Sequence, residues 1–481
     1  MTVNLLVQSA MKLRGSFYVL LVLALVIAFP LLTLRSQVNL QDRDIARIPE
    51  GNKTTRSSAQ FLINRSGFTQ EAIQTGRGIF HHNFADGKKT GCNGIPCDLR
   101  DSLATRAWPQ SKVEASSCET CHGTPRGSAG FGPEEQNIFR DGNRVRTNDM
   151  FGAGLIQQLG IEATEELRAA RKEGRALETA NGVDYGKGLG VRPGGTVDPD
   201  LVVRPFGRKG THSYLRAFIT QAAFDHLGIQ SQDGFQCSDQ NKNENGRCGG
   251  PIIAGIDPDG DGVADELTQG SLSLIEFYLV NYPVPGRGPI TAAVSNGEQV
   301  FKTIGCAECH RPEMRIRHDP RIEHITVFWN EKSNRFEAER LQLHQLRDDG
   351  YVDPDRERPV PIVVPNLRPF VVPLYADLKR HDMGPQMADT NHEAGVSKAV
   401  FITRPLWGVG TYTRFLDDGS AKTLEEAILC HGGEALSTRN RFVRLPSQEQ
   451  SDLITFLKSF VLFNVEDVLT ARIPITKGEL P

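Results

Sequence analysis

The chain has 481 residues, of which 39% are hydrophobic, and this is enough apolar material for two or three domains of ordinary size. The formal net charge is only −3 and no long basic or acidic run occurs, so we expect neither nucleic acid nor a strongly charged membrane surface as a partner. Local motifs therefore carry most of the information about function.

The N-terminus predicts export with an anchor. Lys12 and Arg14 precede an apolar stretch at residues 17–34, which is close to the shortest length that spans a bilayer. The basic flank predicts that residues 1–16 stay in the cytoplasm and that the rest lies on the periplasmic side of a bacterial inner membrane. A cleaved signal peptide is the alternative, but Thr33, Leu34 and Arg35 offer no small-x-small cleavage site. Polar residues 35–67 then predict a tether.

Two copies of the pattern Cys-x-x-Cys-His follow. They are Cys118 to His122, with Cys121 as the second thiol, and Cys306 to His310, with Cys309 as the second thiol. In this pattern the two thiols attach a haem covalently and the adjacent histidine binds its iron. A thioredoxin-like dithiol and a zinc site are the alternatives, but each leaves the histidine unexplained in both copies. The sequence therefore predicts two covalently bound haem c groups.

The other cysteines agree with an oxidising compartment. Cys92 with Cys97, and Cys237 with Cys248, are close enough in the chain to form local disulfides. Cys430 is left over, and a buried thiol of this kind usually behaves as a small hydrophobic residue.

An acidic loop lies between the two motifs. It sets carboxylates at alternate positions with Gly262 at the turn, as calcium loops do, but Thr268 stands where such loops have a bidentate glutamate. The candidate calcium ligands are Asp257, Asp259, Asp261 and Asp265. A plain acidic turn is the alternative.

A proline- and glycine-rich segment, NYPVPGRG, ends at Gly288 and predicts a domain boundary. We expect an N-terminal haem domain at residues 68–284, a C-terminal haem domain at 285–470 and a tail at 471–481. A weak internal echo supports the division, because DMFGAGL at Asp149 follows the first haem motif and PLWGVGT at Pro405 follows the second.

Three capping boxes predict helices in the C-terminal domain. One at Ser295 opens a helix that runs into Cys306, and one at Ser447 opens an amphipathic helix near the end of the domain. The third begins at Thr423 and places His431 on the apolar face of its helix, where a haem could receive it. The fold class we expect is therefore mainly α, with two cytochrome c-like haem domains in tandem, long loop insertions and one N-terminal transmembrane helix.

The sixth iron position separates electron transfer from catalysis, because only an open position can bind peroxide or oxygen. His431 is the favoured ligand for the C-terminal haem, and a core histidine is its alternative reading. The other candidates there are Met314, Met383 and Met387. No ligand stands out for the N-terminal haem, where the candidates are His81, His82, Met150, Glu162 and His212. The indoles available as an aromatic relay between the haems are Trp108, Trp329 and Trp407.

The chain resembles the di-haem oxidoreductase family, which is related to bacterial di-haem cytochrome c peroxidases and to the di-haem enzyme that matures methylamine dehydrogenase. The matching segments are SCETCHG, GRKG, DPDGDGVADELT, NGEQVFKTIGCAECHRPEM, DLKRHDMGPQMAD and PLWGVGTYTRFLDDGSAKTLEEAILCHGGEA. The resemblance implies a reactive N-terminal haem and a C-terminal haem that relays electrons, with His431 as its distal ligand. Two positions depart from the family: Cys430 replaces an aromatic residue, and Asp417 replaces the histidine that the peroxidases carry near the haem edge.

These features predict a peroxidase-like di-haem c-type oxidoreductase in which electrons pass between a bis-histidine C-terminal haem and a reactive N-terminal haem. The expected partners are a small periplasmic electron-transfer protein (a cytochrome or cupredoxin), a small oxidant such as peroxide, and the membrane. The alternative is a membrane-anchored electron carrier without a substrate of its own. A third reading, thiol oxidation, depends on Cys430.

Overall fold

The computed structural model describes residues 76–82, parts of 115–150, most of 151–227 and 267–317, three strands within 323–361, and 370–462. All of these lie in one compact unit, Gly51–Pro481, which separates from Met1–Glu50. The predicted anchor, the acidic loop and the four cysteines expected to pair lie outside the described residues. Within the described part, no helix is long and apolar enough to cross a membrane.

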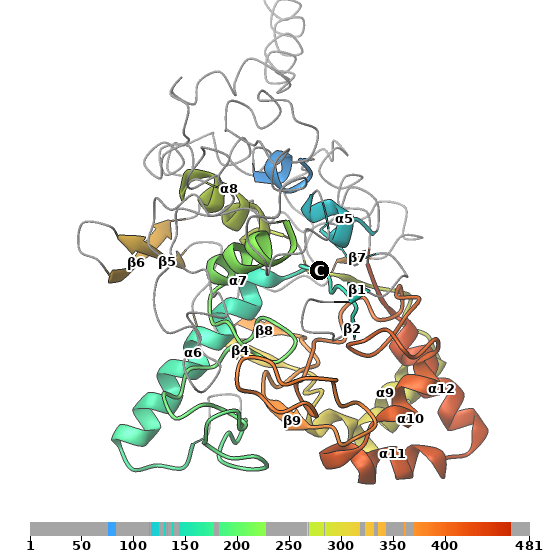
Figure 1. Ribbon diagram of the computed structural model, residues 1–481. Helices are drawn as coiled ribbons and strands as arrows, with labels where there is room; N and C mark the ends of the chain where they lie inside the picture. The colour runs from blue at the N-terminus through green and yellow to red at the C-terminus, as the bar shows by residue number, and fades with distance from the viewer. Residues whose placement is uncertain are drawn as a thin grey trace, which may run out of the picture. The chain divides into compact units, whose positions relative to one another are not determined.

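The first haem motif lies on a short helix, and further helical segments follow it in the N-terminal half. They are α5 (Cys118–His122), α6 (Ala153–Lys172), α7 (Leu215–Ala222), a π-helical turn (Ala223–Leu227) and α8 (Gln269–Val280). Helix α6 begins after Gly152, whose left-handed conformation (φ 65°) ends the preceding loop. Helices α7 and α8 pack together (Figure 1), and the buried ion pair of Arg216 with Glu276 joins them at 3.2 Å.

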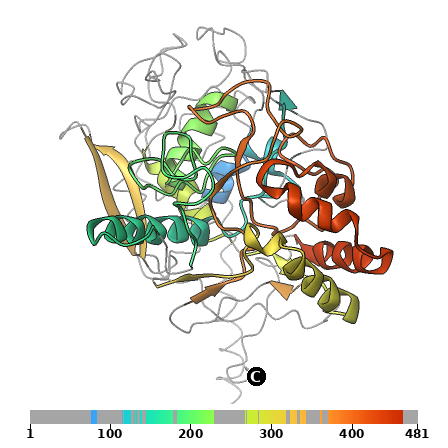
Figure 2. The same ribbon diagram turned by 90° about the horizontal axis from the view of Figure 1, so that it is seen from below.

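The second haem motif lies among four helices and a 3₁₀ turn. They are α9 (Ala292–Thr303), the turn Cys306–Glu308, α10 (Leu424–Cys430), α11 (Leu436–Val443) and α12 (Ser447–Lys458). Helix α9 packs against α12 (Figures 1 and 2), and Gly297 of α9 faces the carbonyl of Asp452 directly. Helix α9 thus leads into the second haem motif and the terminal helix α12 packs against α9, while the cytochrome c-like domain itself stays a prediction.

The strands are short and antiparallel. Strand β1 (Asn137–Ile138) pairs with β2 (Arg144–Val145), β4 (Met314–Ile316) with β8 (Phe370–Val372), and β5 (Glu323–Asn330) with β6 (Arg335–Gln342). Strand β3 (Gly286–Arg287) lies between β7 (Val360–Pro361) and β11 (Phe460–Val461). Strand β9 (Arg380–Asp382) pairs with β10 (Val400–Ile402). The described fold is thus rich in helix, with small sheets in the connections.

One of the hydrophobic clusters joins both sides of the predicted domain boundary. It combines Leu159 and Leu167 of α6 with Met314 of β4, Val372 of β8 and Trp407. The two segments of the internal echo meet in this region, because the ring of Trp407 lies directly against Gly152, where any Cβ would approach Trp407 Cζ3 to 2.2 Å. Only glycine fits that contact.

Two of the predicted capping boxes are wrong and one is confirmed. Helix α9 begins three residues before Ser295 and is capped by Thr291, whose hydroxyl accepts from Val294 N at 3.3 Å. Helix α12 begins at Ser447 itself after Pro446, with no side-chain cap. In both places the chain enters the helix earlier than the motif indicates. The cap at Thr423 is confirmed, since its hydroxyl accepts from Glu426 N at 3.1 Å.

Candidate functional site

The first haem motif holds its thiols on one helical turn. Ser117 caps α5 by accepting from Thr120 N at 3.2 Å, so that Cys118 and Cys121 lie at positions i and i+3 on one face. Nδ1 of His122 is 3.2 Å from the carbonyl of Gly130, which fixes the ring and leaves Nε2 for a metal. Burial lowers the pKa of His122 to about 4, so the imidazole is neutral, the form that binds iron.

The second haem motif is built in the same way on a tighter turn. Gly305 adopts a left-handed conformation (φ 95°) that ends α9 and starts the 3₁₀ turn carrying Cys306. Nδ1 of His310 is 3.1 Å from the carbonyl of Tyr375, again leaving Nε2 for a metal. Burial and the neighbouring His431 lower the pKa of His310 to about 4.

His431 lies opposite His310. It follows the last residue of α10, its Nδ1 is 2.8 Å from the carbonyl of Ala427, and burial lowers its pKa. The ring centres of His310 and His431 are 6.4 Å apart. Two imidazoles that bind one metal from opposite sides at about 2.0 Å per metal–nitrogen bond have ring centres roughly 6.3 Å apart. The measured separation therefore fits one shared iron.

A single cavity of about 780 Å³ is lined by both haem motifs and by His431. Met383 and Met387 also line this cavity, whereas Met314 lies in the core with no exposed surface. Of the candidate ligands near the second motif, the cavity thus brings together His310, His431 and these two methionines.

Buried guanidinium groups in the cavity wall fit a ligand that carries carboxylates. Among the described residues, Nη1 of Arg146 and Nη2 of Arg208 are buried without a hydrogen-bond partner, and both side chains line the cavity. Arginine binds carboxylates through paired N–H groups, and a buried donor without an acceptor is costly. Haem propionates would supply the missing acceptors, so the residues present fit haem.

Asp417 organises these arginines. Its carboxylate accepts from Arg208 at 2.9 Å and from Arg404 at 2.6 Å, and its backbone carbonyl accepts from Arg146 N at 2.8 Å. Burial alone would raise the pKa of Asp417, but the two guanidinium groups lower it below its ordinary value. The residue that replaces the peroxidases' histidine thus holds positive charge in the cavity wall.

Only some of the candidate ligands for the first haem line the cavity. Met150 and His212 line the cavity, but Glu162 accepts from Arg317 N at 2.8 Å in the neighbouring helix–strand contact, and His81 pairs with Glu119 at 3.2 Å. His82 does not line the cavity.

His226 is a cavity residue that the sequence reasoning missed. It lies on the π-helical turn, lines the same cavity as His122, and its charge contributes to lowering the pKa of His122. Such turns often occur at functional sites, but the sequence gives no local signal for one.

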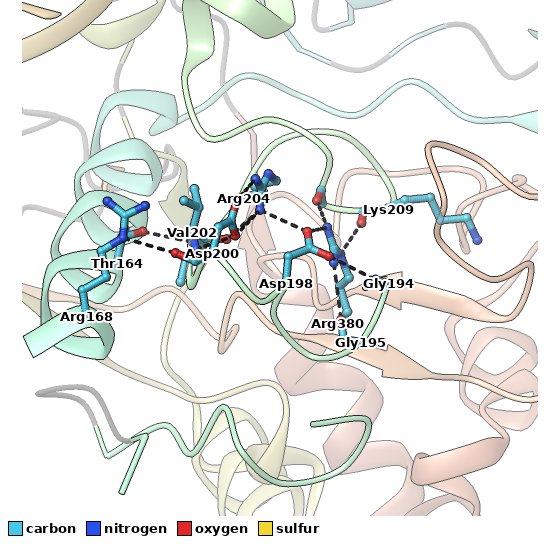
Figure 3. Close-up of polar contacts among 12 residues, drawn as sticks. Thr164, Arg168, Gly194, Gly195, Asp198, Asp200, Val202, Arg204, Lys209 and Arg380 are labelled. Atoms are coloured by element: carbon cyan, nitrogen blue, oxygen red, sulfur yellow. Dashed lines mark hydrogen bonds and ion pairs between the residues drawn. The ribbon is translucent and has the colours of Figure 1, made fainter. Parts of the chain in front are cut away.

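A second missed group surrounds His381 of β9. Its ring nitrogens lie 2.9 Å from Asp377 and 2.9 Å from Glu434, and its Nδ1 is 3.9 Å from the sulfur of Cys309. The adjacent Arg380 anchors the strand by donating to Asp198 and to the carbonyls of Lys209 and Gly210 (Figure 3). The segment DLKRHDMGP, part of the family resemblance, was the available signal.

Between the two motifs, Tyr412 donates a hydrogen bond to Asp149, and the guanidinium carbon of Arg146 lies 4.2 Å from the centre of its ring. Burial raises the pKa of both Asp149 and Tyr412. Trp407 lines the same cavity and its indole donates to the carbonyl of Pro373 at 2.8 Å. Of the three indoles considered as a relay, Trp407 is the one whose side chain is among the described residues.

Cys430 lies beside His431 but outside the cavity lining, and it forms no disulfide. Burial, with Asp418 and Glu426 nearby, raises the pKa of its thiol. A raised pKa disfavours the reactive thiolate, which counts against a role in thiol oxidation.

Comparison with known proteins gives one family match. Residues 363–460 match the family described as di-haem oxidoreductase, putative peroxidase. No curated protein matches the chain. Among solved structures, hydrazine synthase of Kuenenia stuttgartiensis is similar at 13% identity and a TM-score of 0.37, over 84% of this chain and 92% of that one. A MauG-like protein associated with microbial copper homeostasis is similar at 15% identity and a TM-score of 0.36, over 84% and 91%.

Proposed function

From the di-haem oxidoreductase match at residues 363–460, we propose that this protein is a peroxidase-like oxidoreductase carrying two covalently bound haem c groups. One haem is attached at Cys118 and Cys121 with His122 on its iron, and the other at Cys306 and Cys309 with His310 on its iron. The observation that carries the proposal is the 6.4 Å separation of the His310 and His431 rings, which suits a bis-histidine iron.

The C-terminal haem acts as the electron relay in this proposal. His310 and His431 are the residues that would hold its iron, and the carbonyls of Tyr375 and Ala427 hold their rings in place. Bound haem supplies one-electron redox chemistry, and reaction with peroxide where an axial position is open. With both histidines bound to the iron, this haem would take up and pass on electrons without binding peroxide.

The N-terminal haem is the reactive one. Arg146 and Arg208 are the residues that would hold its propionates, and His122 is oriented by the carbonyl of Gly130. His226, in the same cavity, is the residue that we propose as the proton acceptor for an incoming peroxide. Between the two motifs, Tyr412 donates a hydrogen bond to Asp149, which gives both of these groups a partner.

The second candidate function is an electron carrier without its own substrate. The observation that favours it is the same His226, because a second histidine in the cavity of His122 could close the sixth iron position instead of serving as a base. The two functions therefore differ in what His226 does.

We further propose that residues 17–34 anchor the protein in the bacterial inner membrane, with the haem domains in the periplasm. A small cytochrome or cupredoxin would deliver or accept electrons there. The motifs for covalent haem and the predicted disulfides support an exported protein. Calcium binding by Asp257, Asp259, Asp261 and Asp265 stays a prediction.

Low-temperature EPR and visible spectroscopy of the purified protein, fully oxidised and half-reduced, test the function. We expect two haems c per chain, one low-spin with bis-histidine character, and a second that reacts with hydrogen peroxide within seconds. Two low-spin haems that ignore peroxide in both states would support the electron carrier and reject the enzyme.

A further inference from the structure

We propose that His381 is a positioning residue that keeps His431 on the iron of the C-terminal haem. Its ion pairs with Asp377 and Glu434, called the clamp below, hold the segment that orients His310 against the turn that follows His431. The inference rests on the proposed function, because it assumes that His310 and His431 share a haem. It adds a residue that does not itself touch the iron.

The hydrogen bonds of His381 define its charge. Nε2 lies 2.9 Å from Oδ2 of Asp377 and Nδ1 lies 2.9 Å from Oε2 of Glu434. Ionised carboxylates only accept hydrogen bonds, so both ring nitrogens carry a proton and the ring is an imidazolium. Burial alone would lower the pKa of His381, but hydrogen bonds to Asp377, Cys309 and Glu434 raise it to about 12. His381 is 6% exposed as a residue, so this charge acts inside the protein.

Asp377 connects the clamp to the proximal ligand. It lies two residues after Tyr375, whose carbonyl fixes Nδ1 of His310 at 3.1 Å. The other carboxylate oxygen of Asp377 accepts from Lys379 N at 3.0 Å, and its backbone carbonyl accepts from the Tyr185 hydroxyl at 3.2 Å. These hydrogen bonds hold the segment from Tyr375 to His381 in place, and the Tyr375 end of the segment orients the ring of His310.

Glu434 connects the clamp to the distal ligand. It lies in the 3₁₀ turn Gly433–Ala435, three residues after His431, and its second oxygen accepts from Asp382 N at 3.1 Å. Gly433 (φ 49°) lies so close to β9 that a Cβ there would be 2.1 Å from the carbonyl of Asp382. The turn after His431 is thus held against β9 by backbone contact and by the charge of His381.

A metal site is the competing reading of this cluster. Cys309, Asp377 and His381 offer ligand atoms within 4.8 Å of one another. In the proposed function, however, the sulfur of Cys309 is bonded to haem, and both nitrogens of His381 already donate to carboxylates. A protonated imidazole cannot bind a metal, so the clamp accounts for these contacts and a metal does not.

Removing the imidazolium should release the distal side. Without it, the carboxylates of Asp377 and Glu434 lose the donor that lies between them, and Glu434, whose side chain is 31% exposed, would turn towards water. The turn after His431 then loses a contact to β9, and we expect His431 to leave the iron in much of the protein.

The test compares four variants of the full-length holoprotein: His381→Gln, Glu434→Ala, Glu434→Gln and His392→Gln. Glu434→Gln keeps an amide oxygen as acceptor for His381, whereas Glu434→Ala has none. His392→Gln is the matched control, because His392 is an exposed histidine in the segment that follows β9. The measurements are the low-spin EPR signal of the C-terminal haem and the number of carbon monoxide molecules bound by the reduced protein.

We expect His381→Gln and Glu434→Ala to lose most of the bis-histidine low-spin signal and to bind one more carbon monoxide than wild type, while Glu434→Gln and His392→Gln resemble wild type. If His381→Gln keeps the wild-type low-spin EPR signal and binds the wild-type number of carbon monoxide molecules, the clamp is overturned. If His381→Gln does not fold, the clamp is overturned when Glu434→Ala and Glu434→Gln give the same signal and the same carbon monoxide count. A wild-type protein without a bis-histidine haem would instead overturn the proposed function.

Discussion

The crossing of α9 and α12 gives the sharpest stability prediction. At Gly297 a Cβ would lie 2.0 Å from the carbonyl oxygen of Asp452 and 2.7 Å from Cβ of Phe456, and the first of these atoms is backbone and cannot rotate away. Gly→Ala inside a helix normally stabilises by about 0.5–1 kcal/mol. Overpacking costs about 1–3 kcal/mol, and here the helices would have to separate by roughly 1.4 Å to reach ordinary contact. We therefore expect Gly297→Ala to lower the free energy of unfolding by about 1–2 kcal/mol.

Urea unfolding of the holoprotein, followed by far-ultraviolet circular dichroism and by the Soret band, measures this effect. Ser295→Ala is the control, because Ser295 is an exposed residue of the same helix and the change should not destabilise it. If Gly297→Ala unfolds at the same or a higher urea concentration than wild type, the close approach of α9 to α12 is not a constraint on this fold.

Three further predictions concern buried charge and the first haem. The pKa of Asp417 is lower in the folded protein than its ordinary value of 3.8, so its ionised carboxylate stabilises the fold above that pH. This stabilisation is lost as the pH falls through the folded-state pKa. In thermal melts below about pH 4, Asp417→Asn should therefore lose less stability on acidification than wild type does. Arg216→Met removes the guanidinium that is buried against Glu276, and should cost about 3–5 kcal/mol in denaturant titrations; a loss below about 1 kcal/mol would contradict a stabilising buried pair. His226→Phe should change the spin state or the peroxide reactivity of the N-terminal haem while the C-terminal haem keeps its spectrum, and identical spectra in all states would remove His226 from the site.

The parts of the site that depend on local sequence could be predicted. Cys-x-x-Cys-His sets two thiols and a histidine on one turn, and the cap at Thr423 fixes where α10 begins and so where His431 falls. The first residues of two other helices were predicted less accurately. A serine followed three residues later by Glu or Gln is compatible with an N-cap at Ser295 and at Ser447, but the N-cap residues are Thr291 and Pro446, which lie earlier in the chain.

The parts that depend on distant residues could not be predicted. His381 and Glu434 are 53 positions apart, and Arg146 contacts the carbonyl of Leu416 across 270 positions. No spacing rule encodes such pairs, because they arise only when separate segments pack. The same holds for the π-helical turn of His226, which the local pattern around Leu227 does not distinguish from an α-helix.

The contact of Trp407 with Gly152 and the hydrogen bond of Tyr412 to Asp149 also bear on the order of assembly. The second of these joins residues 263 positions apart, so the wall between the two Cys-x-x-Cys-His motifs can close only after most of the chain has been synthesised. Until then the Cys118 and Cys306 motifs lie in a chain that has not yet enclosed them. We therefore expect haem attachment to precede final folding, with each bound haem serving as a template around which its half of the cavity closes.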